Sequence, residues 1–130
     1  MTISFLSFVI AFKISVSLVL LVFPFLLASQ ERLERLTGTT AASPLFFRLY
    51  GIAISALLVG YAFAFPTLQA GQFPWSVAIM GVISNGGGSY LVLRGRTSRA
   101  SRAQGYLFGG IFLALMVSMV VPDLATRRIL

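Results

Sequence analysis

The sequence contains no cysteine and no histidine. These absences exclude disulfide bonds, thiol redox chemistry, metal sites built on thiolate or imidazole, and haem held by histidine. Acidic residues are also scarce, because the chain has only Glu31, Glu34 and Asp123 among its 130 residues. All three lie outside the long apolar segments or at their ends. A proton-coupled transporter that depends on a carboxylate within the membrane is therefore disfavoured.

Enzymatic activity is not expected either. The sequence shows no Ser–His–Asp arrangement, no cluster of metal ligands and no phosphate-binding loop. An acid, a base or an activated nucleophile is needed for most enzymatic reactions, and none can be assigned here. We therefore predict that the protein is not an enzyme and that it uses no cofactor and no metal.

Apolar residues, in contrast, are abundant, with 58% of the chain hydrophobic and only 10% charged. A soluble domain of this size would expose large apolar patches and aggregate. Four apolar segments are each long enough to cross a hydrocarbon core of about 30 Å as a helix. The sequence thus predicts one all-α domain over residues 1–130, an integral membrane bundle of four transmembrane helices. The helices are expected at residues 3–28, 44–65, 74–93 and 102–121.

Local signals suggest where some of these helices begin and end. Ser43 followed by Pro44 is typical of a helix start, with a capping hydroxyl and then proline in the first turn. Pro66 is expected to end that second helix. Ser101 with Gln104 three residues later forms a capping-box pattern, which predicts the start of the fourth helix.

The charged residues indicate the orientation. The net charge is +7, but the arginines lie next to membrane segments, which favours a topological role and contacts with lipid headgroups over nucleic-acid binding. Seven belong to the connectors 29–43 and 94–101 or their edges: Arg32, Arg35, Arg48, Arg94, Arg96, Arg99 and Arg102. Both connectors are therefore expected in the cytoplasm and both termini on the outer side of a bacterial-type inner membrane. Anionic headgroups would meet Arg94, Arg96, Arg99 and Arg102.

The third segment contains a polar, glycine-rich patch around Asn85. Small residues let membrane helices approach closely, so this segment is the expected centre of the bundle. Contacts between helices are expected at Gly60, Gly81, Gly86, Gly87, Gly88, Gly105, Gly109 and Gly110. An alternative interpretation is that the helix breaks at Asn85–Gly88 and that the freed carbonyl groups face a cavity. Close packing is the favoured interpretation.

Lys13 is the clearest anomaly within the apolar segments. If the first helix begins near residue 3, a rise of 1.5 Å per residue places Lys13 about 15 Å deep, and Asn85 reaches a similar depth from Trp75. A charge at this depth is costly and marks a candidate functional site. The predicted intramembrane polar site consists of Lys13, Ser17, Ser55, Ser84 and Asn85. Alternatively, Lys13 extends outward to the interface, or the first residues form a surface helix.

Two functions remain open. The preferred one is a structural or accessory membrane protein, whose small-residue faces pack against copies of itself or against a larger membrane complex. The alternative is a homo-oligomeric channel or carrier for a small anion or lipid headgroup, which would use Lys13 and Asn85 at mid-membrane.

Overall fold

A computed structural model describes residues 3–95 and 97–127 of the chain. Over these residues the protein is helical and contains no strand. Four helical stretches are long and apolar enough to cross a membrane. These stretches are Phe5–Leu27, Pro44–Gln69, Trp75–Arg94 and Arg99–Val120. Over the described residues, the prediction of an all-α chain with four helices long and apolar enough to cross a membrane is confirmed.

The first stretch is built from three consecutive helical elements: α1 (Phe5–Ser17), the π-helical turn η1 (Leu18–Val22) and α2 (Phe23–Leu27). Ser4 caps α1, because its hydroxyl accepts a hydrogen bond from the Ser7 backbone N–H while the Ser7 hydroxyl accepts one from the Ser4 N–H. Pro24 is the second residue of α2, just after the π turn, and it has no N–H to donate to a carbonyl one turn earlier. The carbonyl of Leu20 instead accepts a hydrogen bond from the Gln104 side chain at 3.5 Å.

The second stretch extends beyond its predicted end. The short helix α3 (Gln30–Thr37) precedes it, and α4 (Pro44–Ala62) continues into α5 (Ala64–Gln69). Pro66 does not end the helix as predicted. It occupies the first turn of α5, where a missing backbone N–H breaks no hydrogen bond within that helix.

The third stretch, α6 (Trp75–Arg94), is an unbroken α-helix through Asn85–Gly88. The alternative of a break at this patch is therefore wrong. Glycine weakens a helix in water by about 1 kcal/mol, but an unsatisfied backbone group in hydrocarbon costs several kcal/mol. The membrane environment thus favours helical hydrogen bonds through the glycine run.

The fourth stretch begins earlier than predicted. Helix α7 (Arg99–Val120) is capped by Ser98, whose hydroxyl accepts a hydrogen bond from the Ser101 N–H at 3.1 Å. Ser101 therefore lies inside the helix, and the predicted capping box at this residue is wrong. The short helix α8 (Pro122–Thr126) follows α7.

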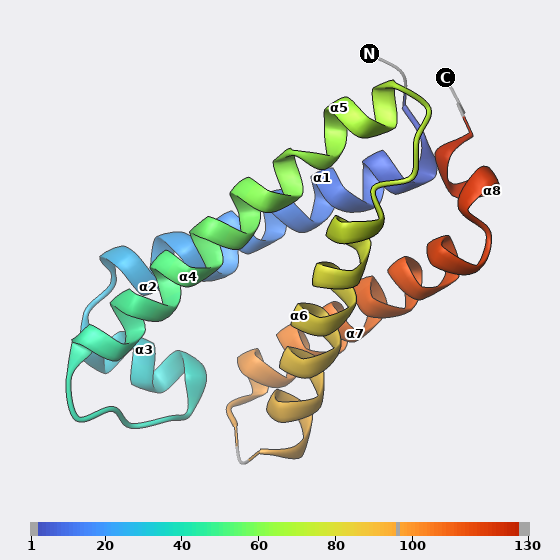
Figure 1. Ribbon diagram of the computed structural model, residues 1–130. Helices are drawn as coiled ribbons and strands as arrows, with labels where there is room; N and C mark the ends of the chain where they lie inside the picture. Colours follow the sequence, from blue (N-terminus) through green and yellow to red (C-terminus); the bar gives the residue numbers. More distant parts are fainter. Residues whose placement is uncertain (1–2, 96, 128–130) are drawn as a thin grey trace.

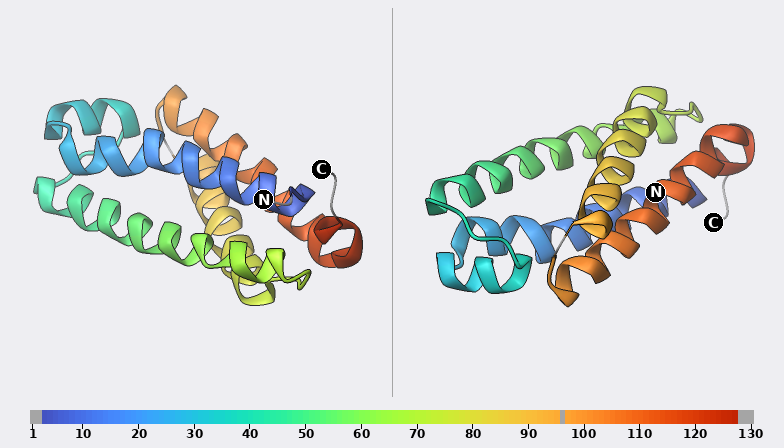
Figure 2. Two further views of the ribbon diagram at one scale, coloured as in Figure 1. Left: turned by 90° about the horizontal axis from the view of Figure 1, so that it is seen from above. Right: turned by 90° about the horizontal axis from the view of Figure 1, so that it is seen from below.

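The helices form two antiparallel pairs (Figure 1). Helix α1 with its continuation runs beside α4 and α5, and α6 forms a hairpin with α7. The hairpin packs across one side of the first pair, with α7 against α1 and α6 at a steep angle to α4 (Figure 2). Both termini lie at the same end of the molecule, beside the connector between α5 and α6 (Figure 1).

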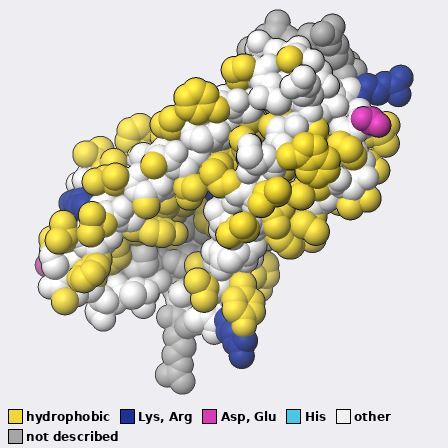
Figure 3. Space-filling view, viewed as in Figure 1, with side chains coloured by type: hydrophobic (Ala, Val, Ile, Leu, Met, Phe, Trp, Pro, Cys, Tyr) yellow, Lys and Arg dark blue, Asp and Glu magenta, His cyan; other side chains and the backbone are white. Residues whose placement is uncertain are grey.

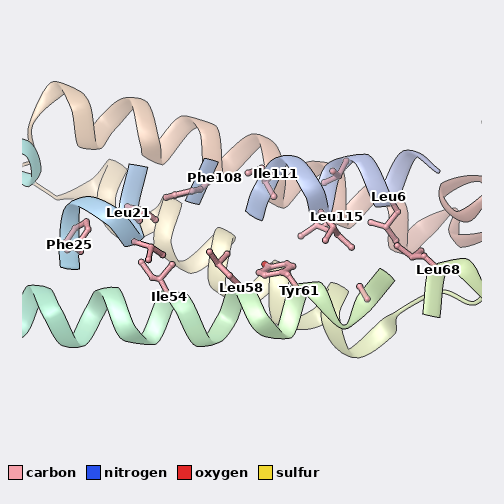
Figure 4. Close-up of a cluster of buried hydrophobic side chains, with 14 of the residues drawn as sticks. Leu6, Leu21, Phe25, Ile54, Leu58, Tyr61, Leu68, Phe108, Ile111 and Leu115 are labelled. Carbon is pink, nitrogen blue, oxygen red and sulfur yellow. The ribbon is translucent and has the colours of Figure 1, made fainter. Parts of the chain in front are cut away.

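Buried apolar side chains pack together between the two pairs. Ile54, Leu58 and Tyr61 on α4 point towards side chains of η1 and α7, among them Leu21 and Phe108 (Figure 4). On the face seen in Figure 3, hydrophobic side chains cover much of the body, while Lys and Arg side chains gather at the ends. This distribution is typical of a protein surrounded by lipid.

The two arginine-bearing connectors meet at the end opposite the termini. The Ser101 hydroxyl reaches the carbonyl oxygens of Leu36 and Thr37, each at 3.2 Å. The Ser98 N–H donates to the Thr37 carbonyl at 3.3 Å, and the Ser98 hydroxyl donates to Leu36. The last carbonyls of α3 are thus satisfied by the first turn of α7. The connectors 29–43 and 94–101 therefore share one side, whichever compartment it faces.

Candidate functional site

A cavity of about 50 Å³, which we call the inner cavity, lies between the four long helical stretches. Its polar lining comes from Lys13 on α1, Tyr50 and Tyr61 on α4, and Ser84 and Asn85 on α6. Its remaining lining residues are Leu21, Ile54, Leu57, Leu58, Gly88 and Phe108. The structure therefore brings three of the five predicted polar residues, Lys13, Ser84 and Asn85, to one cavity.

Lys13 is buried, with 8% of its surface exposed. Its Nζ lies 4.1 Å from the centroid of the Phe108 ring. An ammonium group over an aromatic face is attracted by the ring's quadrupole, and the attraction grows when water is excluded. The lining of the cavity includes no carboxylate, so the positive charge has no counter-charge there. The side chain points into the bundle and does not extend outward along the lipid-facing surface.

Asn85 is 1% exposed and holds the centre of a hydrogen-bond network. Its Nδ2 donates to the Gly81 carbonyl at 2.7 Å and to the Tyr61 hydroxyl at 2.9 Å. The hydroxyls of Tyr61 and Ser84 are 3.2 Å apart. Within the part of the chain that the structure describes, the buried Oδ1 of Asn85 has no hydrogen-bond partner. An unpaired buried acceptor is costly, and a bound group can satisfy it.

The other two predicted residues lie elsewhere. Ser55 donates to the Gly51 carbonyl within α4 and is not part of the cavity lining. Ser17 is fully buried, is not part of the lining either, and its hydroxyl has no partner among the described residues. Sequence reasoning missed Tyr61 and Phe108, although a tyrosine deep in an apolar segment is a signal that its hydroxyl needs a partner.

A second, larger cavity of about 490 Å³ lies between the hairpin and the first helix pair, next to the meeting connectors. It shares the side chains of Leu21, Tyr50 and Phe108 with the inner cavity, so the two adjoin. Its remaining walls are Phe25, Thr37, Thr39, Thr40, Ala41, Ala42, Phe46, Phe47, Val92, Thr97, Ser101 and Gln104. We call this space the outer chamber. No carboxylate lines it.

The arginines predicted to bind headgroups lie near this end. Arg94, Arg99 and Arg102 are exposed, and the Arg94 guanidinium contacts the Tyr90 ring and hydroxyl. Arg96 lies outside the described residues. Arg48 has a structural role, because it donates to the carbonyls of Phe25 and Ala28 at 2.7 Å each, at the end of α2.

The predicted packing glycines fall into two groups. A Cβ atom would come within 3.4 Å of a neighbouring helix at five of them and would have no neighbour within 4 Å at three. The close positions are Gly60, Gly81, Gly86, Gly105 and Gly109, and the open ones are Gly87, Gly88 and Gly110. The first group marks helix contacts within the chain, and α6 meets α7 through most of them.

A comparison of the chain with known protein families, curated proteins and solved structures finds no match. The small cavity brings together the buried Lys13 ammonium, three hydroxyl groups and the unpaired amide oxygen of Asn85. The ammonium and the hydroxyls can donate hydrogen bonds to a negatively charged group, whereas the amide oxygen needs a donor from a ligand or a water.

Proposed function

We propose that this protein binds a small anionic group at the inner cavity and carries it across the membrane. The observation that supports the proposal is the position of Lys13. Its ammonium group is buried at a cavity without a carboxylate, 4.1 Å from the Phe108 ring centroid. Keeping a charge there without a partner is costly, and an anion in the cavity would remove that cost.

The surrounding groups suit this role. The hydroxyls of Tyr61 and Ser84 can donate hydrogen bonds to an anion, while the free Oδ1 of Asn85 can accept one from a ligand hydroxyl or a water. Hydrogen bonds within a water-poor cavity are stronger than those in bulk water. The outer chamber, which shares Leu21, Tyr50 and Phe108 with the cavity, supports a route of entry from the connector side.

Anion flux in liposomes tests this proposal. We expect uptake of a small anion such as acetate into liposomes that contain the protein, and at least a tenfold loss with Lys13→Met. Lys13→Arg, which keeps the charge, should retain part of the flux. Leu49→Ala, at an exposed residue of α4 outside the cavity lining, is the control. No flux, or equal flux for wild type and Lys13→Met, contradicts the proposal.

The proposed orientation places the connectors 29–43 and 94–101 in the cytoplasm. Because the chain has no cysteine, single cysteines introduced at Thr39 and at Gly71 can be labelled from one side of sealed inner-membrane vesicles. Inside-out bacterial vesicles should label Thr39→Cys with an impermeant maleimide and leave Gly71→Cys unlabelled. The opposite pattern would reverse the orientation.

A second candidate function is the accessory role. Gly87 on α6 is exposed between Ile83 and Leu91, each 69% exposed, and it has no neighbour within 4 Å of an added Cβ. An exposed glycine on a lipid-facing helix supports association with another membrane helix. Gly87→Ile should then weaken association measured by energy transfer between labelled copies, or abolish co-purification with a larger complex. A protein that remains monomeric and without partners before the substitution would rule out this role.

A further inference from the structure

We propose that the ligand is a monocarboxylate with an apolar, aromatic body, whose carboxylate occupies the inner cavity while its body fills the outer chamber. This inference rests on the proposed function and specifies the chemical class of the ligand. It depends on the sizes of the two spaces, on their walls and on the side chains they share.

The inner cavity sets the size of the charged group. Its volume is about 50 Å³, and one water molecule occupies about 30 Å³ in the liquid. A carboxylate fits this space, whereas a phosphodiester with its glycerol backbone is too large. Of the two ligands considered from the sequence, a small anion is therefore favoured over a lipid headgroup, and a carboxylate is such an anion.

The outer chamber sets the nature of the body. Its volume of about 490 Å³ lies within the range of about 300–1,000 Å³ found for small-molecule sites. Aromatic rings dominate one wall, with Phe25 5.8 Å from Phe47 and 5.3 Å from Tyr50 between ring centroids, both in inclined arrangements. Rings in such a wall favour edge-to-face or offset contacts with another ring. An aromatic body matches this wall better than a polar one.

Three shared side chains connect the two spaces. Leu21, Tyr50 and Phe108 line both, and the Phe108 ring lies against the Lys13 ammonium. A ligand with its carboxylate near Lys13 therefore has its body next to Phe108 and Tyr50. The charge and the apolar body of one molecule are thus recognised by adjoining groups.

The rim of the chamber is polar where the connectors meet. The side chains of Thr39, Thr40, Thr97 and Gln104 belong to this rim, and it includes no carboxylate. The exposed Arg94, Arg99 and Arg102 belong to the connector 94–101 or its edges, at this end of the molecule. A positively charged surface around an entrance raises the local concentration of anions. We therefore infer that the ligand enters from the connector side.

Binding to the purified full chain in detergent tests the inference, with protein-free micelles subtracted. The probes are 3-phenylpropionate, acetate, 3-phenylpropan-1-ol and 3-phenylpropylamine, measured by calorimetry. We expect 3-phenylpropionate to bind at least tenfold tighter than each of the other three. Acetate lacks the body, the alcohol lacks the charge, and the amine carries the opposite charge.

Two variants separate the contribution of the ligand's charge from that of its aromatic body. Lys13→Met should remove the preference for the acid over the alcohol, and Lys13→Gln is the second choice if Lys13→Met does not fold. Phe46→Ala, at an exposed side chain that lines the outer chamber and not the inner cavity, should weaken 3-phenylpropionate several-fold and leave acetate unchanged. Leu49→Ala, on the same helix and outside both linings, should change neither.

The outcomes distinguish the two proposals. If acetate and 3-phenylpropionate bind equally and both depend on Lys13, the aromatic body is refuted and the anion site stands. If the alcohol binds as tightly as the acid and Lys13→Met has no effect, the chamber is merely apolar and both proposals fail. Absence of binding by every probe also overturns both.

Discussion

The contact between α6 and α7 differs sharply from the junction between this hairpin and the α1–α4 pair. In the hairpin, glycines bring the two helices together, so that a Cβ at Gly86 would lie 2.7 Å from the Phe112 ring and one at Gly105 2.9 Å from Leu93. At the junction, large side chains such as Phe47, Tyr50 and Phe108 face one another across a chamber of about 490 Å³. In lipid, small residues permit helices to close, and large ones hold them apart. The same bundle is therefore tightly packed between α6 and α7 and open at the outer chamber.

The largest expected effect on the unfolding free energy is the difference between a glycine of α6 that contacts other helices and one that contacts none. A Cβ at Gly81 would lie 2.5 Å from Leu115 Cδ1 and 2.9 Å from the Tyr61 hydroxyl, whereas Gly87 has no neighbour within 4 Å. Overpacking a tight contact costs about 1–3 kcal/mol, so Gly81→Val should lower the unfolding free energy by that amount. Gly87→Val should change it little. Unfolding in detergent measures both, and equal losses would show that the contact at Gly81 is unimportant.

The next effect concerns the meeting connectors. Gly38 and Gly71 have nearly equal φ angles, 71° and 72°, but a Cβ would lie 2.6 Å from the Ser98 backbone N at Gly38 and meet nothing at Gly71. A left-handed conformation costs a non-glycine residue about 1–2 kcal/mol. Gly71→Ala should lose about that much, and Gly38→Ala clearly more, in the same unfolding measurement. A difference near zero would mean that the connectors do not pack as described.

A smaller effect is expected in the polar network. Tyr61→Phe removes the hydroxyl that accepts from Asn85 Nδ2 and contacts Ser84. Hydrogen bonds between membrane helices contribute about 0.6 kcal/mol on average, so the unfolding free energy should fall by roughly that amount. Tyr106→Phe, at a side chain 70% exposed, should have no effect. A loss equal to that of Gly81→Val would mean that the polar network stabilises the bundle as much as the glycine contact does.

The smallest effect concerns the connector 29–43. The hydrogen bond from the Gln30 side chain, together with that from the Ala41 N–H, holds the pKa of Glu34 below its usual value of 4.5. Because the pKa is lowered in the folded protein, this contribution to stability is present above pH 4.5 and is lost as the pH falls through the lower folded value.

Hydrogen exchange of the Ala41 amide should therefore show reduced protection, after correction for the intrinsic rate, as the pH falls below 4.5. Glu34→Gln, which does not titrate, should remove this pH dependence. An unchanged profile in that variant would assign the effect to another group.

The helices could be predicted because each apolar run is long enough to cross a membrane, but their ends could not all be read from local signals. Pro66 was expected to end a helix and instead lies in the first turn of α5, where its missing N–H causes no loss within that helix. Ser101 was expected to cap α7, but its hydroxyl reaches α3, and Ser98 takes the cap. Both differences depend on neighbouring residues that a local pattern does not include.

The candidate site, too, could be predicted from the sequence only in part. Residue counts along a helix give depth, which is why Lys13 and Asn85 were placed at one level. Depth alone does not say which way a side chain faces, and Ser17 and Ser55 at similar depth lie outside the cavity lining. Tyr61 joins the network because α4 turns the face carrying Ile54 and Leu58 towards the bundle.

The sequence alone determined that this chain is helical and has four segments long and apolar enough to cross a membrane, because the hydrophobic effect and the need to satisfy backbone hydrogen bonds act on every residue of an apolar run. Only the tertiary structure decided which glycines are contacts, where the chamber lies and what surrounds Lys13. Those features follow from the rotation of each helix about its axis, which packing against the other helices sets.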